Sequence, residues 1–268
     1  MAWRVLSTAP RVAVAPALFD PDVCARLVAA ARPYFDRPEV SSSSSSYQTR
    51  PAASCGDEVM TILRGANIIQ AAENATGIAY RPGEDIVIAR TSCAATPQYS
   101  NGDMHLSGTL FSSVHHDRNN AGNGGERAAT FMVYLTTIAA GNGGETFFPA
   151  LNSSVEEDPV ARALEASYLA ERRILELESS LSVKCEELLV RWRRGGGGDG
   201  DGGDGGGGRA GGGGGVHCEA GKAVVFGASC KFGSWHAPCS VGGGTEDKWI
   251  VSFFKAPQKR FSGMMIGL

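Results

Sequence analysis

The sequence lacks an apolar run long enough to span a bilayer, and its first residues contain no long apolar segment of a secretory signal. We therefore expect the chain as given to be soluble; its compartment is left open, with the endoplasmic reticulum lumen and the cytoplasm as alternatives. The sequence also lacks a basic surplus: its formal net charge is −3. Nucleic-acid-binding domains normally carry such a surplus, so we expect no nucleic-acid partner.

Closely spaced cysteine pairs are absent as well. The seven cysteines are odd in number and widely separated, and no two of them form a CxxC pair. This spacing argues against a zinc ribbon and against a thioredoxin-like redox motif. One or two disulfides and a set of mostly free thiols both remain open. The cysteines are Cys24, Cys55, Cys93, Cys185, Cys218, Cys230 and Cys239.

The chain has enough apolar residues for a substantial core. Of its 268 residues, 43% are hydrophobic and 20% are charged, which suits one large domain or two small ones. Glycine is abundant at 36 residues, but many of these lie in one tract over Gly195–Gly215. We find no internal repeats.

Two helices are expected in the first third of the chain. Asp20 is a good N-cap and Pro21 suits the first helical position, and the apolar periodicity continues to about Ala31. A second helix is expected from about Asp57 to Asn74. Its buried side would contain Val59, Ile62, Leu63, Ile68 and Ile69.

Short runs of β-branched and aromatic residues predict strands in the rest of the chain. In the strongest run, alternation places Thr130, Met132 and Tyr134 on one face and Phe131, Val133 and Leu135 on the other. Helices followed by short strands indicate an α+β domain with a β-sandwich or barrel core. The expected strands lie at 11–19, 85–90, 127–136, 145–149, 222–227 and 247–254.

The pattern changes between two of these strands. Leucines and isoleucines at helical spacing, mixed with charges, predict a solvent-exposed amphipathic helix or helix pair over 158–192. The tract Gly195–Gly215 follows and is expected to be a flexible linker. Together they indicate an insert over 151–215 within the domain.

One short motif points to a metal ion. His115 and Asp117 are two residues apart, and His236 follows far downstream in a loop rich in Gly, Ser and Pro. Two histidines and one carboxylate can occupy one face of a non-haem Fe(II) ion and leave its other positions open. His116 is the rival ligand, but no carboxylate stands at the corresponding spacing from it.

Six segments in the same order resemble the prolyl 4-hydroxylase family of Fe(II)- and 2-oxoglutarate-dependent dioxygenases. This resemblance covers residues 10–257, apart from the insert, and implies a double-stranded β-helix (jelly-roll) core supported by the N-terminal helices. The segments are His115-x-Asp117, Arg127-x-Ala-Thr130-x-x-x-Tyr134-Leu135, Gly143-Gly144-Glu145-Thr146-x-Phe148-Pro149, Gly221-Lys-Ala-Val-Val-Phe226, His236-Ala-Pro-Cys-Ser-Val241 and Lys248-Trp249.

The resemblance also implies a site. His115, Asp117 and His236 correspond to the iron ligands of the family, and Lys248 to the basic residue that pairs with the far carboxylate of 2-oxoglutarate. Tyr134 takes the place of a tyrosine that helps to bind this carboxylate. Thr130 and Thr146 are expected to line the same pocket. The implied cofactors are Fe(II), 2-oxoglutarate, O₂ and ascorbate as the reductant.

The implied activity is hydroxylation of a prolyl residue in a peptide or protein, as in procollagen-proline 4-dioxygenases, with release of succinate and CO₂. Two alternatives remain open. The same chemistry could act on another amino-acid side chain or a small molecule, or the chain could be a catalytically inactive peptide-binding relative. The sequence does not indicate an oligomeric state.

Overall fold

A computed structural model gives the fold of the chain. It describes residues 3–8, 11–36, 47–92, 117, 119–120, 125–140, 142–149, 151, 162, 188–189, 192, 214–228, 235–239, 241 and 246–256. Antiparallel strands and helices make up this part of the molecule, which is therefore α+β, as the sequence predicts.

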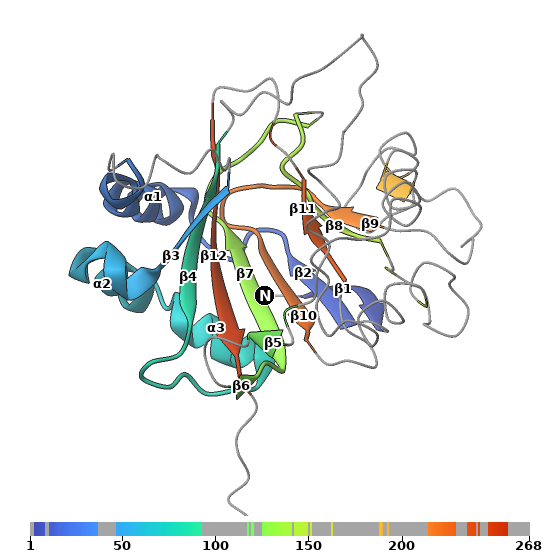
Figure 1. Cartoon of the computed structure of the whole chain (residues 1–268), viewed down its shortest axis with the longest axis horizontal. Helices are drawn as coiled ribbons and strands as arrows, with labels where there is room; N and C mark the ends of the chain where they lie inside the picture. The colour runs from blue at the N-terminus through green and yellow to red at the C-terminus, as the bar shows by residue number, and fades with distance from the viewer. Residues whose placement is uncertain are drawn as a thin grey trace, which may run out of the picture.

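Seven antiparallel strands form the main sheet, in the spatial order β1-β2-β10-β7-β12-β4-β3 (Figure 1). β7 and β12 form a central pair, with Tyr134 opposite Ile250 and Ala129 opposite Lys255. Their runs of β-branched and aromatic residues suit a sheet that is buried on both faces. The seven strands are β1 (Arg4–Thr8), β2 (Arg11–Ala15), β10 (Ala223–Gly227), β7 (Ala129–Tyr134), β12 (Lys248–Lys255), β4 (Ile86–Thr91) and β3 (Tyr47–Pro51).

A smaller sheet lies on the opposite side of the main sheet from the helices (Figure 1). It has the order β11-β8-β9, with β11 (Ala237–Pro238), β8 (Thr146–Phe148) and β9 (Gly214–Val216). Side chains of both sheets, including Met132, Tyr134, Phe148 and Val216, form one buried apolar cluster between them. A separate hairpin pairs β5 (Asn119–Asn120) with β6 (Gly125–Glu126).

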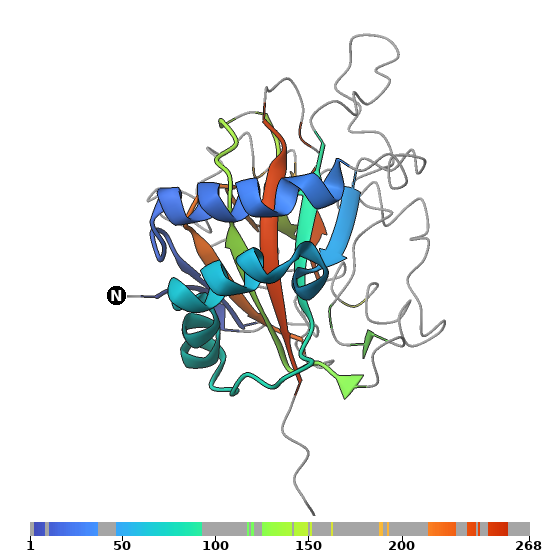
Figure 2. The same ribbon diagram turned by 90° about the vertical axis from the view of Figure 1, so that its left-hand side faces the viewer.

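Three helices cover the outer face of the main sheet (Figure 2). They are α1 (Pro21–Phe35), α2 (Asp57–Gly65) and α3 (Ile68–Thr76), with a short 3₁₀ helix, η1 (Ala52–Cys55), before α2. The side chain of Asp20 accepts a hydrogen bond of 2.8 Å from the amide of Asp22, which confirms the expected cap of the first helix. A second buried cluster joins these helices to the sheet.

The alternation predicted for 127–136 is confirmed. Met132 and Tyr134 belong to the cluster between the two sheets, whereas Phe131, Val133 and Leu135 belong to the cluster beneath the helices. The main sheet therefore separates two cores, and the residue at each position of β7 faces one of them.

The prediction of one helix from Asp57 to Asn74 is wrong. α2 ends at Gly65, and Asn67 adopts a left-handed conformation with φ 57° before α3 begins. Asparagine tolerates this conformation better than most residues. The break lets Val59 and Leu63 of α2 and Ile68 of α3 enter the same core.

The predicted insert and linker are too long at their C-terminal end. Gly214 and Gly215 belong to β9, where Thr146 pairs with Val216 and Phe148 with Gly214. A Cβ on Gly215 would lie 2.6 Å from the ring of Trp192, and one on Gly214 would collide with Leu151. Close packing therefore requires glycine at these two positions, and they are not part of a flexible linker.

The end of the predicted helical segment is also buried. Leu188, Leu189 and Trp192 are helical and almost inaccessible to solvent. The ring of Trp192 lies 6.1 Å from that of Phe147 in β8. This end therefore packs on the small sheet, whereas the sequence predicts a solvent-exposed helix. Most of 152–187 lies outside the described residues.

Two other expectations concern boundaries and cysteines. β1 pairs with β2 and belongs to the main sheet, so a domain that starts at residue 10 omits a strand. Among the described cysteines, Cys24, Cys55, Cys218 and Cys239 are buried and form no disulfide, in line with the open alternative of mostly reduced thiols.

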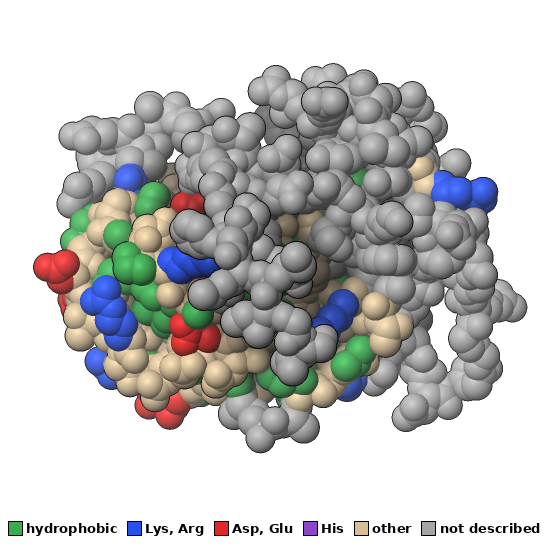
Figure 3. Space-filling view, turned by 90° about the horizontal axis from the view of Figure 1, so that it is seen from below, with side chains coloured by type: hydrophobic (Ala, Val, Ile, Leu, Met, Phe, Trp, Pro, Cys, Tyr) green, Lys and Arg blue, Asp and Glu red, His purple; other side chains and the backbone are tan. Residues whose placement is uncertain are grey.

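The described surface has no separation of charge on the face seen from below, where acidic and basic side chains are interspersed (Figure 3). None of the helices in the described ranges has the length and apolar character needed to cross a membrane.

Candidate functional site

Asp117 and His236 face one another in the interior. Asp117 lies in a turn, and His236 directly precedes β11; both side chains are buried. The distance from Asp117 Oδ2 to His236 Nε2 is 3.8 Å. Two ligands at right angles on a metal ion, with bonds of about 2.1 Å, lie roughly 3 Å apart. A small closing movement would allow both atoms to bind one metal ion.

Neighbouring side chains hold both groups in place. Thr130 Oγ1 donates a hydrogen bond of 2.7 Å to Asp117 Oδ2, the oxygen that also faces the histidine. The imidazole of His236 packs against Phe226 and Phe148, at centroid distances of 4.7 Å and 5.8 Å. Such outer contacts orient metal ligands and keep water away from them.

The third predicted ligand, His115, lies outside the described residues, as does its rival His116. Among the described residues no group of three His, Cys, Asp or Glu side chains is close enough to hold a metal ion. The complete ligand set therefore stays a prediction. An imidazole nitrogen facing a carboxylate oxygen in a buried setting is a donor set that suits Fe(II).

Lys248 begins β12 and points into the space between the sheets. It shares a face of the strand with Ile250, which belongs to the inner cluster, whereas Trp249 belongs to the outer one. Its exposed fraction is 2%. Burial lowers the pKa of Lys248, although the thiols of Cys218 and Cys239 and the carboxylate of Glu145 act in the opposite direction.

The ammonium group of Lys248 has weak partners. Its Nζ lies 3.5 Å from the carbonyl oxygen of Glu145 and 5.5 Å from the centre of the Tyr134 ring. By contrast, buried Lys222 and Lys255 have carboxylate oxygens at 2.9 Å and 2.8 Å, from Glu219 and Glu84. Within the described part of the chain, Lys248 is thus a buried cation without a carboxylate in salt-bridge contact.

Tyr134 and Thr146 lie beside this lysine. The hydroxyl of Tyr134 lies 2.7 Å from Thr146 Oγ1 and 3.2 Å from the carbonyl oxygen of Val216, and donates its proton toward them. Both residues are buried. When Thr146 accepts this bond, its own hydroxyl proton is available to another acceptor. Lys248, Tyr134 and Thr146 thus bring three polar groups together in an apolar setting.

The structure separates the predicted pocket residues into two groups. Thr130, which the resemblance places beside 2-oxoglutarate, is bonded to Asp117, so its observed contact is with the candidate metal ligand. Tyr134 and Thr146 are near Lys248. Arg50 belongs to β3 and lies over the ring of Phe35 on the helix side.

Sequence reasoning did not identify several neighbours of Lys248. The carbonyl oxygen of Glu145 accepts hydrogen bonds from the amide of Cys239 and from the lysine itself. Cys218 donates to the carbonyl oxygen of Thr136 at 3.1 Å, and burial raises the pKa of its thiol to about 11. These residues are far apart in the chain, and only their pairing across strands brings them to the lysine.

Solved structures with a similar architecture are known. HygX from Streptomyces hygroscopicus, solved with nickel and 2-oxoglutarate bound, is 11% identical, with a TM-score of 0.51, over 94% of this chain and 85% of that one. The chain has the fold of HygX. This fold, with its antiparallel sheets, agrees with the core that the resemblance to 2-oxoglutarate-dependent oxygenases implies.

Two prolyl hydroxylases are also similar. The viral collagen prolyl hydroxylase from Paramecium Bursaria Chlorella virus-1 is 16% identical, with a TM-score of 0.46, over 91% of this chain and 94% of that one. A prolyl-4-hydroxylase from Pseudomonas putida is 12% identical, with a TM-score of 0.40, over 92% of each chain. No protein-family model and no curated protein sequence matches this chain.

Proposed function

We propose that the chain is an Fe(II)- and 2-oxoglutarate-dependent oxygenase. The observation that carries the proposal is Lys248, a buried ammonium group whose hydrogen-bond partner among the described residues is a carbonyl oxygen at 3.5 Å. Burying an uncompensated charge is costly, so such a group is best explained by an anion that binds to it. The far carboxylate of 2-oxoglutarate would be that anion.

The spacing along β7 supports a ligand that bridges two groups. Thr130 supports the candidate metal ligand Asp117, and Tyr134 lies beside Lys248 on the same face of the strand. Four residues of a strand span about 13 Å. A five-carbon dicarboxylate can cover this span when it chelates a metal ion at one end and accepts hydrogen bonds at the other.

Each residue then has a defined task. Asp117 and His236, with His115 as the predicted third ligand, would hold the iron, and Thr130 would fix the orientation of the carboxylate. The ammonium of Lys248 and the hydroxyl of Thr146 would donate to the far carboxylate of the co-substrate. Phe148 and Phe226 exclude water on the side of His236. Bound iron would supply the activation of O₂ by which the 2-oxo acid and a C–H bond are oxidised.

A prolyl residue of a peptide or protein is the proposed substrate. The support is the order of six sequence segments that resemble prolyl 4-hydroxylases. One oxygen atom of O₂ would enter the new hydroxyl group and the other would enter succinate, while the first carboxylate of 2-oxoglutarate would leave as CO₂. Ascorbate would serve as the reductant that keeps the iron in the Fe(II) state.

The test is a coupled assay with Fe(II), 2-oxoglutarate, ascorbate and a panel of Pro-rich peptides. We expect peptide-dependent succinate release and a product that is heavier by one oxygen atom, and both signals should disappear in His236→Ala. Succinate without a modified peptide would favour another substrate. Co-substrate binding without any turnover would favour the inactive peptide-binding relative, and absence of binding would refute the proposal.

A further inference from the structure

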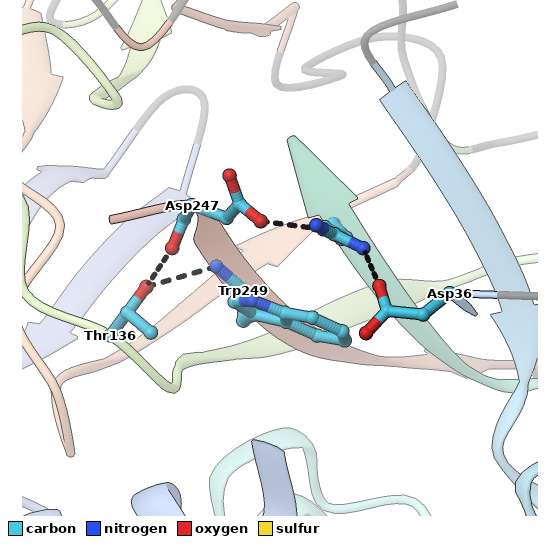
Figure 4. A network of polar contacts seen from close by, with 5 residues as sticks. Asp36, Thr136, Asp247 and Trp249 are labelled. Carbon is cyan, nitrogen blue, oxygen red and sulfur yellow. Dashed lines mark hydrogen bonds and ion pairs between the residues drawn. The ribbon is translucent and has the colours of Figure 1, made fainter. Parts of the chain in front are cut away.

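Arg90 connects two carboxylates on the helix side of the main sheet. Its Nε donates to Asp247 Oδ2 and its NH1 donates to Asp36 Oδ1, both at 2.6 Å. Asp36 ends α1, and Asp247 directly precedes Lys248. Figure 4 shows Asp36 and Asp247 on opposite sides of Trp249. Arg90 and Asp247 are both largely buried, so their charge-assisted bond is stronger than a surface ion pair, whereas Asp36 is half exposed and its bond contributes less.

Trp249 is the apolar centre of this arrangement. The guanidinium carbon of Arg90 lies 5.4 Å from its ring centre, and that of Arg32 lies 5.6 Å away. Phe35 of α1 packs edge-on against the same ring at a centroid distance of 4.9 Å. The tryptophan is fully buried. The C-terminal end of α1 and the start of β12 are therefore held together through one indole.

Thr136 fixes the backbone on both sides of Lys248. Its hydroxyl donates to the carbonyl oxygen of Asp247 at 3.0 Å and accepts from the amide of Trp249 at 3.0 Å (Figure 4). Arg90 holds the side chain of Asp247, and its register partner across β4 and β12 is Trp249. Both neighbours of Lys248 are thus restrained through their backbone and their side chains.

We propose that Arg90 is a positioning residue for Lys248. Successive residues of a strand face opposite sides of the sheet, so restraining Asp247 and Trp249 on one side sets the direction of Lys248 on the other. Among the described residues, the side-chain contacts of Arg90 are with Asp36, Asp247 and Trp249, and none is with Asp117, His236 or the ammonium group of Lys248. It acts through the strand by defining where the ammonium meets an anion, and the inference that this anion is 2-oxoglutarate rests on the proposed function.

The side chain of Arg90 is suited to this task in a way that lysine is not. Its planar group reaches two carboxylates in different directions and stacks on an aromatic ring, whereas an ammonium on a flexible chain does neither well. Displacing a binding group by about 1 Å is enough to weaken a site substantially. We therefore expect Arg90→Lys to recover only part of the function lost in Arg90→Met.

The experiment compares Arg90→Met with a matched control, Arg127→Met, whose side chain packs on the other end of β12. Arg127 also bonds to an aspartate, Asp85 at 3.4 Å, and lies 3.6 Å over the ring of Phe254, but at the far end of β12. Arg127→Met therefore removes a similar cluster without touching the surroundings of Lys248. Both variants are prepared as full-length protein, and their stability is measured by urea unfolding.

Two readouts are taken. In protein labelled with ¹³C at lysine Cε, the Lys248 signal (identified through Lys248→Arg) should shift in Arg90→Met and stay in place in Arg127→Met. The Kd for 2-oxoglutarate, measured calorimetrically with Ni(II) in the metal site, should rise about tenfold in Arg90→Met and change less than twofold in Arg127→Met. In turnover, we expect KM for 2-oxoglutarate to rise while kcat stays nearly constant.

The outcomes separate the two proposals. An unchanged Lys248 signal in Arg90→Met, or equal shifts in both variants, would overturn the role of Arg90 and show that it only stabilises the fold. If wild-type protein does not bind 2-oxoglutarate, the proposed function fails, but the Lys248 signal still decides the positioning role.

Discussion

Lys248 holds a positive charge where it is excluded from water, and the described residues compensate that charge poorly. Its counterparts Lys222 and Lys255 are equally buried, yet each contacts a carboxylate. Charged groups in binding sites are often retained at a cost in stability because the ligand needs them. Lys248 fits this pattern, since burial lowers its pKa and a bound anion would stabilise its charged form.

The proposed site therefore predicts pH-dependent binding. Burial lowers the pKa of Lys248 below its usual value, and a bound carboxylate would raise it again. Binding then takes up a proton once the pH exceeds the lowered pKa of the unliganded protein. The affinity for 2-oxoglutarate should be constant below that pKa and should fall by up to about tenfold per pH unit above it.

Isothermal titration between about pH 7 and pH 10 measures this dependence. Lys248→Arg is the control, because arginine stays charged over the whole range and should give weaker but flatter binding. An equal slope in both proteins would contradict the assignment, since the titrating group would then lie elsewhere.

Among the elements, β8 and β9 define where the insert joins the core. Phe148 pairs with Gly214, so the chain leaves the small sheet and returns to it at adjacent positions. The last two glycines of the tract are part of the strand, and Leu151 and Trp192 occupy the space that a Cβ would need on Gly214 and Gly215. We therefore expect the protein to tolerate a shorter tract but not the loss of its last two glycines.

Two deletions test this difference. Removing residues 195–213 should leave the urea midpoint nearly unchanged, because loop length contributes little to stability. Removing 195–215 should lower the unfolding free energy by roughly 2 kcal/mol or more, because β9 loses its pairing and Trp192 loses its packing surface. Equal stability of the two variants would show that β9 is dispensable.

The elements that could be predicted from the sequence are those with a clear local signal. β7 and β12 are runs of β-branched and aromatic residues, and Asp20 with Pro21 marks the start of α1. β9 has two glycines among its three residues, so it has no pattern to find. The break at Asn67 was missed because the apolar residues on either side of it continue a helical spacing.

The site shows the same limit. Asp117, His236, Lys248, Tyr134 and Thr146 were candidates because the order of the motifs resembles a family. The network of Asp36, Arg90, Thr136 and Asp247 could not be found in this way. Its members come from four separate parts of the chain, and ion pairs between distant residues leave no periodic signal in a sequence.

At the scale of the whole molecule, the main sheet separates a core under the helices from a core that contains the candidate site. The first core includes the helices and gives the sheet a rigid support. The second contains the small sheet and the poorly compensated lysine. Ligands should therefore stabilise the protein mainly by completing the second core.

Thermal unfolding tests this expectation. Ni(II) together with 2-oxoglutarate at about 100 times its Kd should add roughly 2.7 kcal/mol, equivalent to a rise in Tm of about 5–10 °C. His236→Ala should lose the metal-dependent part, and Lys248→Ala should lose the part due to 2-oxoglutarate while still responding to metal. A wild-type response in His236→Ala would remove it from the set of metal ligands.

The pairing of β8 with β9 has a practical consequence. Facing residues of an antiparallel pair lie only about 5 Å apart, so Phe148 and Gly214 are the neighbouring ends of one long connection between β8 and β9. Such a connection can accept a folded guest domain whose own termini are close together. A fluorescent protein inserted within 195–213 would label the protein internally, without a fusion at either terminus.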